Sequence, residues 1–383
     1  MGCVRWLRLI LLFAGVLLLA GGLATGWQGQ RTRTALEHDL TVEAAERASG
    51  VADYFNRARD VALLTAHNPV FTDFYAAPGE RVAKIRRDTA LMAEVNSALA
   101  YLQRLYPGRI GEACFIDSGG AENARVVSGK PAVPNDLSPH ESHNPFFQPT
   151  FALDVGQVYQ AQPYVSPDTH EWVISNSTPV PLPAGQHAII HFEVTMEGMR
   201  QAVAPEDSRL EAQIVDRANG EVVVDSRVPQ QIGEPLAVPA PSWVPALAGR
   251  SAASGLMSAD GREMAYLRLP ASDGSASNAN DWVVVVSARA PHAFWAGPFA
   301  AGPLLLDAGG LLLLAFAALG YRRHQRALAE AAATDDLTGL ANRARFRQRL
   351  AAMFVVQPPG PAAVLLLDLD RFKIVNDTLG HQV

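Results

Sequence analysis

Two long apolar stretches stand out in the hydrophobic pattern of the chain, at residues 7–27 and 299–321. About twenty apolar residues suffice to cross the hydrocarbon core of a bilayer, so each stretch is predicted to be a transmembrane helix. A cleaved signal peptide is the alternative for the first stretch. Its cleavage site would be Gly22-Leu23-Ala24, which is a poor one, and the apolar run is long, so an uncleaved anchor is favoured.

Between the two stretches, helical periodicity comes first and strand alternation follows. Leu36, Leu40, Ala44 and Ala48 share one helical face, which predicts a helix over residues 28–66. A second helix is predicted over 80–105, closed by Pro107-Gly108. Strand patterns follow at 110–117, 125–127, 156–160, 172–175, 188–194, 211–216, 221–225, 263–269 and 282–288. The first two strands flank a Ser-Gly-Gly turn and predict a hairpin, whereas residues 228–259 are rich in Pro, Ala and Ser and predict loop.

Basic residues flank both apolar stretches on the same side. Arg5 and Arg8 accompany the first, and Arg322, Arg323 and Arg326 follow the second, which predicts that both termini are cytoplasmic. The predicted division is a cytoplasmic N-terminus (1–6), a span (7–27), an external region (28–298), a second span (299–321), a signalling helix (322–333) and a C-terminal segment (334–383).

Asp307 lies inside the second span, where a carboxylate is costly. Two interpretations stay open: a pairing or relay role, or hydration near the outer interface. The adjacent Gly309-Gly310 pair would let a neighbouring helix approach closely, which fits a dimer.

Composition adds limits on partners. The net charge of −6 without a basic stripe argues against nucleic acid. The two cysteines, Cys3 and Cys114, are predicted to lie on opposite sides of the membrane, so no disulfide is expected, and neither has metal ligands nearby in sequence. His140 and His143 also lack further ligands at useful spacing, so no zinc is expected there.

The C-terminal segment carries the residues most suited to chemistry. Residues 363–367 form a continuous apolar run, typical of a strand buried on both faces. Asp368 and Asp370 follow at i and i+2, and Lys373 comes shortly after. Mg²⁺ prefers oxygen ligands and is often shared between one or two carboxylates and substrate phosphates, so this pattern suits a metal-bound polyphosphate. A solvated strand end is the competing interpretation.

Two motifs then carry a family resemblance. TDDLTGLANRARF (334–346) and LDLDRFKIVNDTLGH (367–381) together resemble the opening of the GGDEF family, the bacterial diguanylate cyclases. The resemblance implies an α/β palm-type, ferredoxin-like domain, of which residues 334–383 cover about the first third. The family's naming signature would come later, so an incomplete and inactive fragment is expected.

The resemblance also implies roles for single residues. It assigns a divalent metal, Mg²⁺ or Mn²⁺, to the Asp368 carboxylate and the Leu369 carbonyl. It assigns phosphate contacts to the main-chain N–H groups of Arg371 and Phe372 and to the Lys373 side chain, and a guanine contact to Asn376. Asp370, Asp377 and His381 match the pattern as structural residues.

The external region resembles the double Cache extracellular sensor domain, an α+β fold. CFIDSGGAENARVVSG (114–129), SHNPFFQPTFAL (142–153) and QPYVSPDTHEWVISNSTPV (162–180) carry the resemblance. It implies a distal module at about 67–200, a proximal module at about 205–290 and a distal pocket for a small metabolite.

The same resemblance narrows the ligand. Amino-acid-binding members use Arg-x-Trp-Tyr where this chain has Asn144-Pro145-Phe146-Phe147, and without the Arg there is no bidentate carboxylate clamp, so an amino acid is not expected. The candidate pocket residues are Phe146, Phe147, Tyr164, Asp168 and Trp172, each equally explained as a core or turn residue.

These parts combine into a predicted sensor diguanylate cyclase of the bacterial inner membrane. It would join two GTP into cyclic di-GMP as a homodimer, under control of an unidentified external ligand. The alternative is a transmembrane sensor whose degenerate output domain only binds a nucleotide or recruits a protein. Asp368, Lys373 and Asn376 are all present, which favours the enzyme. A class III nucleotide cyclase is disfavoured by the TDDLTGLANR lead-in.

Overall fold

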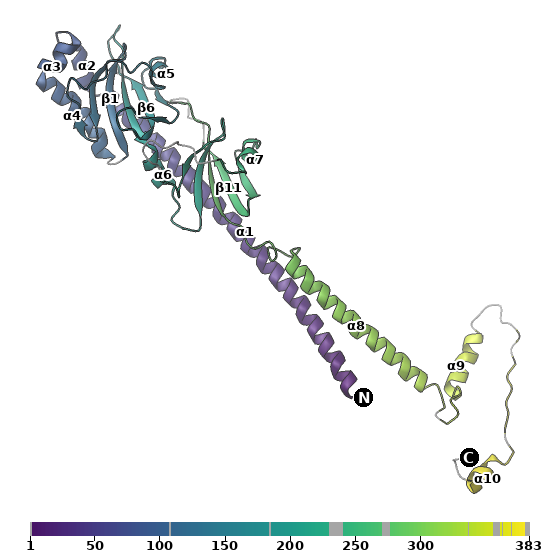
Figure 1. The fold of residues 1–383 in the computed structure, drawn as a ribbon. Helices are drawn as coiled ribbons and strands as arrows, with labels where there is room; N and C mark the ends of the chain where they lie inside the picture. Colours follow the sequence, from purple (N-terminus) through teal and green to yellow (C-terminus); the bar gives the residue numbers. More distant parts are fainter. Residues whose placement is uncertain are drawn as a thin grey trace. The chain divides into compact units, whose positions relative to one another are not determined.

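The computed structural model describes residues 2–106, 109–183, 185–229, 240–269, 276–335, 337–354, 361, 363–368 and 370–379. The chain divides into two units, one of residues 1–22 with 305–383 and one of residues 23–304. Helices α1 (Gly2–Ala66) and α8 (Ala301–Ala331) are each long and apolar enough to cross a membrane (Figure 1). The first predicted span is therefore part of a longer helix, and the second is part of one from Ala301 onward.

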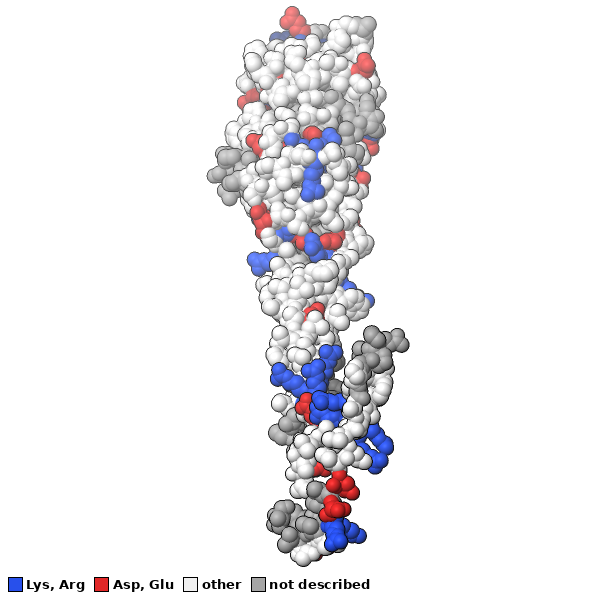
Figure 2. Space-filling model, turned by 90° about the vertical axis from the view of Figure 1, so that its right-hand side faces the viewer, with Lys and Arg blue, Asp and Glu red and all other residues white. Residues whose placement is uncertain are grey.

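In the first unit, α1 and α8 pack closely through glycines. A Cβ atom added to Gly310 would lie 2.8 Å from the carbonyl oxygen of Gly15, and one added to Gly15 would lie 2.9 Å from Leu314. The close approach predicted at Gly309-Gly310 is thus made within one chain. Oδ1 of Asp307 is buried and has no hydrogen-bond partner among the described residues. Figure 2 shows basic side chains gathered next to a stretch whose visible side chains are almost all uncharged.

Three further helices precede the sheets of the second unit: α2 (Pro69–Ala76), α3 (Arg81–Arg87) and α4 (Thr89–Leu105). The predicted single helix over 80–105 is wrong, because the backbone at Asp88 leaves the helical region (φ −89°, ψ 77°). The Asp88 carboxylate accepts the Leu91 N–H at 3.1 Å, which supports a new helical start. Helix α2 was not predicted; Asn68 caps it and Pro69 opens it.

The larger sheet has eight strands in the order β12-β4-β6-β7-β1-β2-β3, with β5 paired to β6. Its strands are β1 (Ile110–Asp117), β2 (Glu122–Val127), β3 (Lys130–Pro131), β4 (Val158–Gln160), β5 (Tyr164–Val165), β6 (Trp172–Pro179), β7 (Ala188–Thr195) and β12 (Ala276–Asn278). All pairs are antiparallel except β12 with β4. The predicted β1–β2 hairpin is confirmed, and Asp117 accepts the N–H groups of Gly119 and Ala121 in its turn.

The smaller sheet has five strands in the order β10-β11-β13-β8-β9. They are β8 (Glu211–Asp216), β9 (Val222–Asp225), β10 (Ser254–Ala259), β11 (Arg262–Arg268) and β13 (Trp282–Arg289), and α6 (Met196–Val203) precedes them. Residues 228–259 were predicted to be loop, and of these, 230–239 lie outside the described residues. In the described remainder the prediction is wrong over two elements. Helix α7 (Val244–Ala248) and strand β10 lie there, because Val244, Leu247 and Met257 pack into a core that propensity alone did not reveal.

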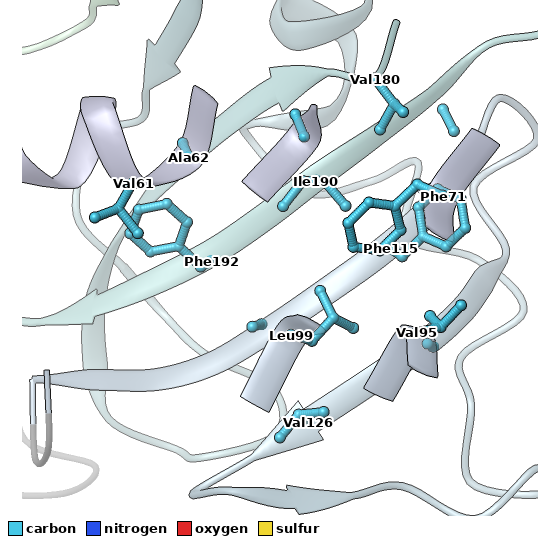
Figure 3. Packing of buried hydrophobic residues seen from close by; sticks show 14 of the residues in the cluster. Val61, Ala62, Phe71, Val95, Leu99, Phe115, Val126, Val180, Ile190 and Phe192 are labelled. Atoms are coloured by element: carbon cyan, nitrogen blue, oxygen red, sulfur yellow. The ribbon is translucent and has the colours of Figure 1, made fainter. Parts of the chain in front are cut away.

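Helix α1 contributes residues to the cores beside both sheets. Leu40, Ala44, Ala48 and Val51 of α1 pack with the smaller sheet, as their predicted shared face requires. Further along, Val61 and Ala62 pack with Phe115, Ile190 and Phe192 of the larger sheet (Figure 3). Helix α1 therefore runs along both sheets, as Figure 1 shows.

Candidate functional sites

The larger sheet has one apolar face and one polar face. On β1, Ala113 and Phe115 belong to the core beneath the helices. Since side chains alternate along a strand, Glu112 and Cys114 lie on the opposite face. Neighbouring strands extend this pattern, because Cys114 pairs with Arg125 of β2 and His191 of β7. The result is a band of polar residues across the middle of the sheet.

This polar face is buried by the covering segment, the part of the chain between β3 and β6 that carries Phe146, Tyr164 and Asp168. Phe146, which precedes α5 (Phe147–Phe151), stacks on the His191 ring with centroids 3.8 Å apart. The Tyr164 hydroxyl donates to Oε1 of Glu193 at 2.7 Å. Ser175 Oγ lies 2.7 Å from His191 Nδ1, on the side of the ring away from Glu193. Glu193 and His191 are each 2% exposed, so the centre of this polar face is shielded from bulk water.

Carboxylates outnumber cations in this buried layer. Arg125 Nη1 contacts Oδ1 of Asp168 at 2.6 Å and Oε2 of Glu122 at 3.4 Å. Glu112 and Glu193 receive no contact from a described Lys or Arg. Burial, and then the negative charges of Glu193 and Asp168, raise the pKa of Glu112 well above its usual value.

The pKa values of two neighbours of Glu112 are raised as well. Burial raises the pKa of Glu122 to about 7, against the opposing effects of the Ser138 N–H and of Arg125. Burial also raises the pKa of the Cys114 thiol, and Glu112 adds to that shift. Cys114 Sγ lies 2.7 Å from Oε1 of Glu112 and 3.4 Å from Oε1 of Glu122, and its single proton can be donated to either oxygen. One oxygen each of Glu112 and Glu193, Oε2 in both, has no hydrogen-bond partner among the described residues.

The structure brings three of the five predicted pocket residues to this face. Phe146, Tyr164 and Asp168 contact His191, Glu193 and Arg125 respectively. Phe147 is a packing residue in a small cluster with Cys114, Ile116 and Ile189. Trp172 points the other way and packs against the core of the smaller sheet. The predicted turn at Asp168-Thr169 is also present, between β5 and β6.

Sequence reasoning missed Glu112, Glu122, Glu193 and His191. It also took Cys114 to have no metal-ligand company, whereas the structure brings two carboxylates close to its thiol. Glu112 stands two positions earlier on the same strand face, and Glu122 comes from the adjacent strand. An alternating polar pattern usually marks a solvated sheet face, so burial by the crossing chain was the missing information.

The C-terminal segment starts with a compact turn after α8. Oδ1 of Asp335 accepts the backbone N–H groups of Leu337 and Thr338 and the Thr338 hydroxyl. The bond from the Thr338 N–H is the main reason why the pKa of Asp335 lies below its usual value. Asn342 then caps α9 (Arg343–Met353) by accepting the N–H groups of Ala344 and Arg345. The polar residues of this motif therefore shape the backbone.

Comparison with known proteins identifies this segment. Residues 332–383 match the family described as "Diguanylate cyclase, GGDEF domain". Residues 332–383 are a GGDEF segment. An uncharacterized protein of Mycobacterium tuberculosis (strain H37Rv), Rv1354c, is 55% identical over 47 residues, 12% of this chain and 8% of that protein. The probable diguanylate cyclase DgcE of Escherichia coli (strain K12) is 44% identical over 62 residues, 16% of this chain and 6% of that protein. The matched part is thus a small share of each relative.

In the GGDEF segment, the candidate nucleotide residues lie around a tight turn. Asp368 and Asp370 are exposed, Arg371 has a left-handed backbone (φ 59°), and α10 (Phe372–Leu379) follows. The Arg371 carbonyl accepts the Ile374 N–H at 2.9 Å, and Lys373 is exposed in the first turn of α10. Leu369 and His381 lie outside the described residues, as do the side chains of Phe372 and Asn376.

One prediction for the GGDEF segment is wrong in this structure. Residues 363–367 were expected to form a strand buried on both faces, but 363–368 are assigned to no strand. Leu365, Leu366 and Leu367 are 82%, 93% and 83% exposed. A strand needs a ladder partner, and none of the described residues provides one for this run.

Solved structures resemble about two thirds of the chain. A domain of a protein from Vibrio parahaemolyticus, assigned to the sensory box/GGDEF family, aligns with a TM-score of 0.50 and 13% identity, covering 68% of this chain and 97% of that domain. The extracellular domain of the histidine kinase vpHK1S-Z8 aligns at 0.49 and 13%, covering 68% of this chain and 93% of the other. What this chain has in common with the Vibrio parahaemolyticus domain is the fold. Three parts of the predicted fold class are confirmed: two candidate membrane helices, an α+β region with the fold of the Vibrio parahaemolyticus domain, and a GGDEF segment.

Proposed function

We propose that the protein is a membrane-bound sensor diguanylate cyclase that forms cyclic di-GMP from two GTP. The observation that carries the proposal is the GGDEF match at 332–383, within which Asp368 and Lys373 stand on either side of the turn before α10. The 44% identity to the probable diguanylate cyclase DgcE over 62 residues supports the proposal.

The residues present fit a divalent cation. Asp368 offers an exposed carboxylate at a turn, and Mg²⁺ or Mn²⁺ commonly takes one or two carboxylates while its other positions go to water and phosphate. In this proposal the Asp368 carboxylate and the Leu369 carbonyl hold the metal, which supplies charge neutralisation at the reacting phosphate.

The remaining groups position the nucleotide. The left-handed residue at Arg371 turns the chain so that the N–H groups of Arg371 and Phe372 precede and open α10, where they can meet an anion. Lys373 adds a positive charge one residue later, and Asn376 would hydrogen-bond guanine. Attack of a 3′-hydroxyl on an α-phosphate depends mainly on such positioning and charge neutralisation.

The sensing part of the proposal concerns the larger sheet and the spans. A small external ligand would act at the covered polar face, to which Phe146, Tyr164 and Asp168 all contribute, and Phe147 would support it by packing. Helix α8 would carry the change to the GGDEF segment of a homodimer in the inner membrane. Arginines next to both spans place both termini in the cytoplasm in this proposal.

Cyclic di-GMP formation from GTP and Mg²⁺ tests the proposal. We would compare the 383-residue chain with a version extended after Val383 by the remaining part of a GGDEF domain. We expect product from the extended version only, since the apolar run 363–367 is unpaired here. In that version Asp368→Asn should lower the rate at least about 100-fold, by analogy with the loss of a positioned charge-stabilising group.

The matched control is Asp370→Asn, which removes the neighbouring carboxylate that we assign a structural role. It should retain most of the rate. If the extended protein binds GTP and makes no product, the non-catalytic sensor becomes the better description. Product from the 383-residue chain would show that residues 1–383 suffice for the reaction.

A further inference from the structure

We propose that Glu112, Cys114 and Glu122 form a binding site for a zinc-like divalent cation within the larger sheet. One donor atom from each residue lies within 4.8 Å of the other two. The three residues come from the antiparallel pair β1–β2, so their backbone positions are fixed by the ladder. The site rests on the fold of the sheet and does not depend on the cyclase proposal.

The spacing of the donors suits a tetrahedral metal. With a Zn–S distance of about 2.3 Å and a Zn–O distance of about 2.0 Å, a tetrahedral ion separates sulfur from oxygen by about 3.5 Å. Cys114 Sγ lies 3.4 Å from Oε1 of Glu122, close to that value. Oε1 of Glu112 lies nearer, at 2.7 Å, where it can accept the thiol proton. A modest side-chain rotation of Glu112 would open that distance once the proton is gone.

Unpartnered buried oxygens provide an independent reason to place a cation here. Glu112 and Glu193 are 3% and 2% exposed, and Oε2 of each has no hydrogen-bond partner among the described residues. Glu193 acts electrostatically on both Glu112 and Cys114. A buried acceptor without a partner is costly, and a bound cation would remove that cost for the cluster.

The charge balance points in the same direction. Asp168, Glu112, Glu122 and Glu193 are four carboxyl groups, whereas Arg125 is the described guanidinium that contacts this group. Within the described residues, His191 is the remaining nearby base, and its Nδ1 is already engaged by Ser175. A divalent ion would bring most of the missing positive charge to the centre of the cluster.

The donor set and the packing favour a metal ion over an organic amine. A thiol adds nothing to ammonium recognition, but a thiolate is a strong ligand for zinc and similar ions. Phe146, which is 1% exposed, already stacks on His191 over this face. An organic molecule would have to displace that ring, whereas an ion fits between donor atoms that are already close. Binding breaks the Cys114 S–H bond, forms a metal–sulfur bond and releases the proton to solvent.

Co²⁺ is the probe, because a cobalt–thiolate bond gives a near-ultraviolet charge-transfer absorption. The full chain, purified in detergent and stripped with a chelator, would be titrated with CoCl₂ and then with ZnCl₂. We expect one Co²⁺ per chain with the thiolate band and displacement of the band by Zn²⁺. Cys114→Ser should abolish the band, and Glu112→Gln and Glu122→Gln should each weaken binding by about 100-fold or more, the upper end of what outer-shell changes cost.

The control variants separate the alternatives. Cys3→Ser removes the other thiol of the chain and should leave the band unchanged. Asp154→Asn removes an exposed carboxylate and should leave the affinity unchanged. The proposal is wrong if chelator-treated protein shows no thiolate band at saturating Co²⁺, or if the band survives in Cys114→Ser. It is also wrong if folded Glu112→Gln and Glu122→Gln bind Co²⁺ like the parent, or if a simple alkylamine raises the unfolding temperature while Co²⁺ and Zn²⁺ do not. Because metal binding is read without GTP, its failure is distinct from a failure of the cyclase assay.

Discussion

At the scale of single residues, the Arg125–Asp168 pair holds the covering chain onto the larger sheet. The pair is short, at 2.6 Å, and only 10% and 23% of its side chains are exposed. We expect Asp168→Ala to lower the free energy of unfolding by about 1.5–3 kcal/mol, the range for a hydrogen bond to a charged group. Denaturant unfolding of the full chain, followed by tryptophan fluorescence, measures this.

The control for that prediction is Asp154→Ala, which removes an exposed carboxylate of the same covering region and should change stability by less than about 0.5 kcal/mol. Equal effects of the two variants would show that the pair contributes nothing. In that case Asp168 would be available to an external ligand, as the sequence-based interpretation of the pocket allowed.

The residue scale also shows what a sequence can and cannot provide here. Phe146, Tyr164 and Asp168 were identified because they lie in a segment with a family resemblance, and the structure places them on one face. Glu112 and Glu193 were missed because they are brought opposite each other by pairing of β1 with β7 across some eighty positions. Neither the distant pairing nor the covering segment is encoded in local periodicity.

At the scale of elements, the packing of α1 on α8 depends on small residues. A Cβ at Gly310 would meet the Gly15 carbonyl oxygen at 2.8 Å, so Gly310→Val forces the helices apart. We expect the loss of stability to be about 1–3 kcal/mol, typical of an overpacked contact. The unfolding temperature of the detergent-solubilised chain provides the measurement.

The control for this prediction is a substitution in the other helix, α1. A Cβ at Gly21 would meet nothing within 4 Å, so Gly21→Val should leave the unfolding temperature nearly unchanged. If Gly310→Val behaved like Gly21→Val, the two helices would not pack in this way in the purified protein, and Gly309-Gly310 would again be available for contact between chains.

Elements also differ in how well their patterns predict them. The helix over 28–66 was predicted correctly as part of α1, because its apolar face repeats over many turns against a core. The run 363–367 has an equally strong apolar pattern, yet it forms no strand, because strand pairing requires a partner from elsewhere. An apolar pattern can therefore predict a helix from the residues of that helix alone. To predict a strand, the segment that pairs with it must be known too.

At the scale of the whole molecule, one helix joins the parts that would have to communicate. Helix α1 contributes Leu40 to the core of the smaller sheet and Ala62 to the core of the larger one. Strand β12, which precedes β13 of the smaller sheet in the chain, pairs instead with β4 of the larger sheet. A change at the covered polar face would therefore have two covalently continuous routes to the smaller sheet, and α1 itself continues into the first apolar stretch.

The orientation of the chain in a membrane is the prediction that decides whether this arrangement can carry an external signal inward. Because arginines flank both apolar stretches on the same side, we expect residues 28–298 to be external and the GGDEF segment to be cytoplasmic. In a Cys3→Ser background, where the remaining native thiol is the buried Cys114, single cysteines would be placed at the exposed Asp154 and Glu330. A membrane-impermeant maleimide should label Asp154→Cys in intact cells and Glu330→Cys only after permeabilisation. The reverse pattern would put the candidate GTP site on the side without GTP, and labelling of both in intact cells would show that α8 does not cross the membrane.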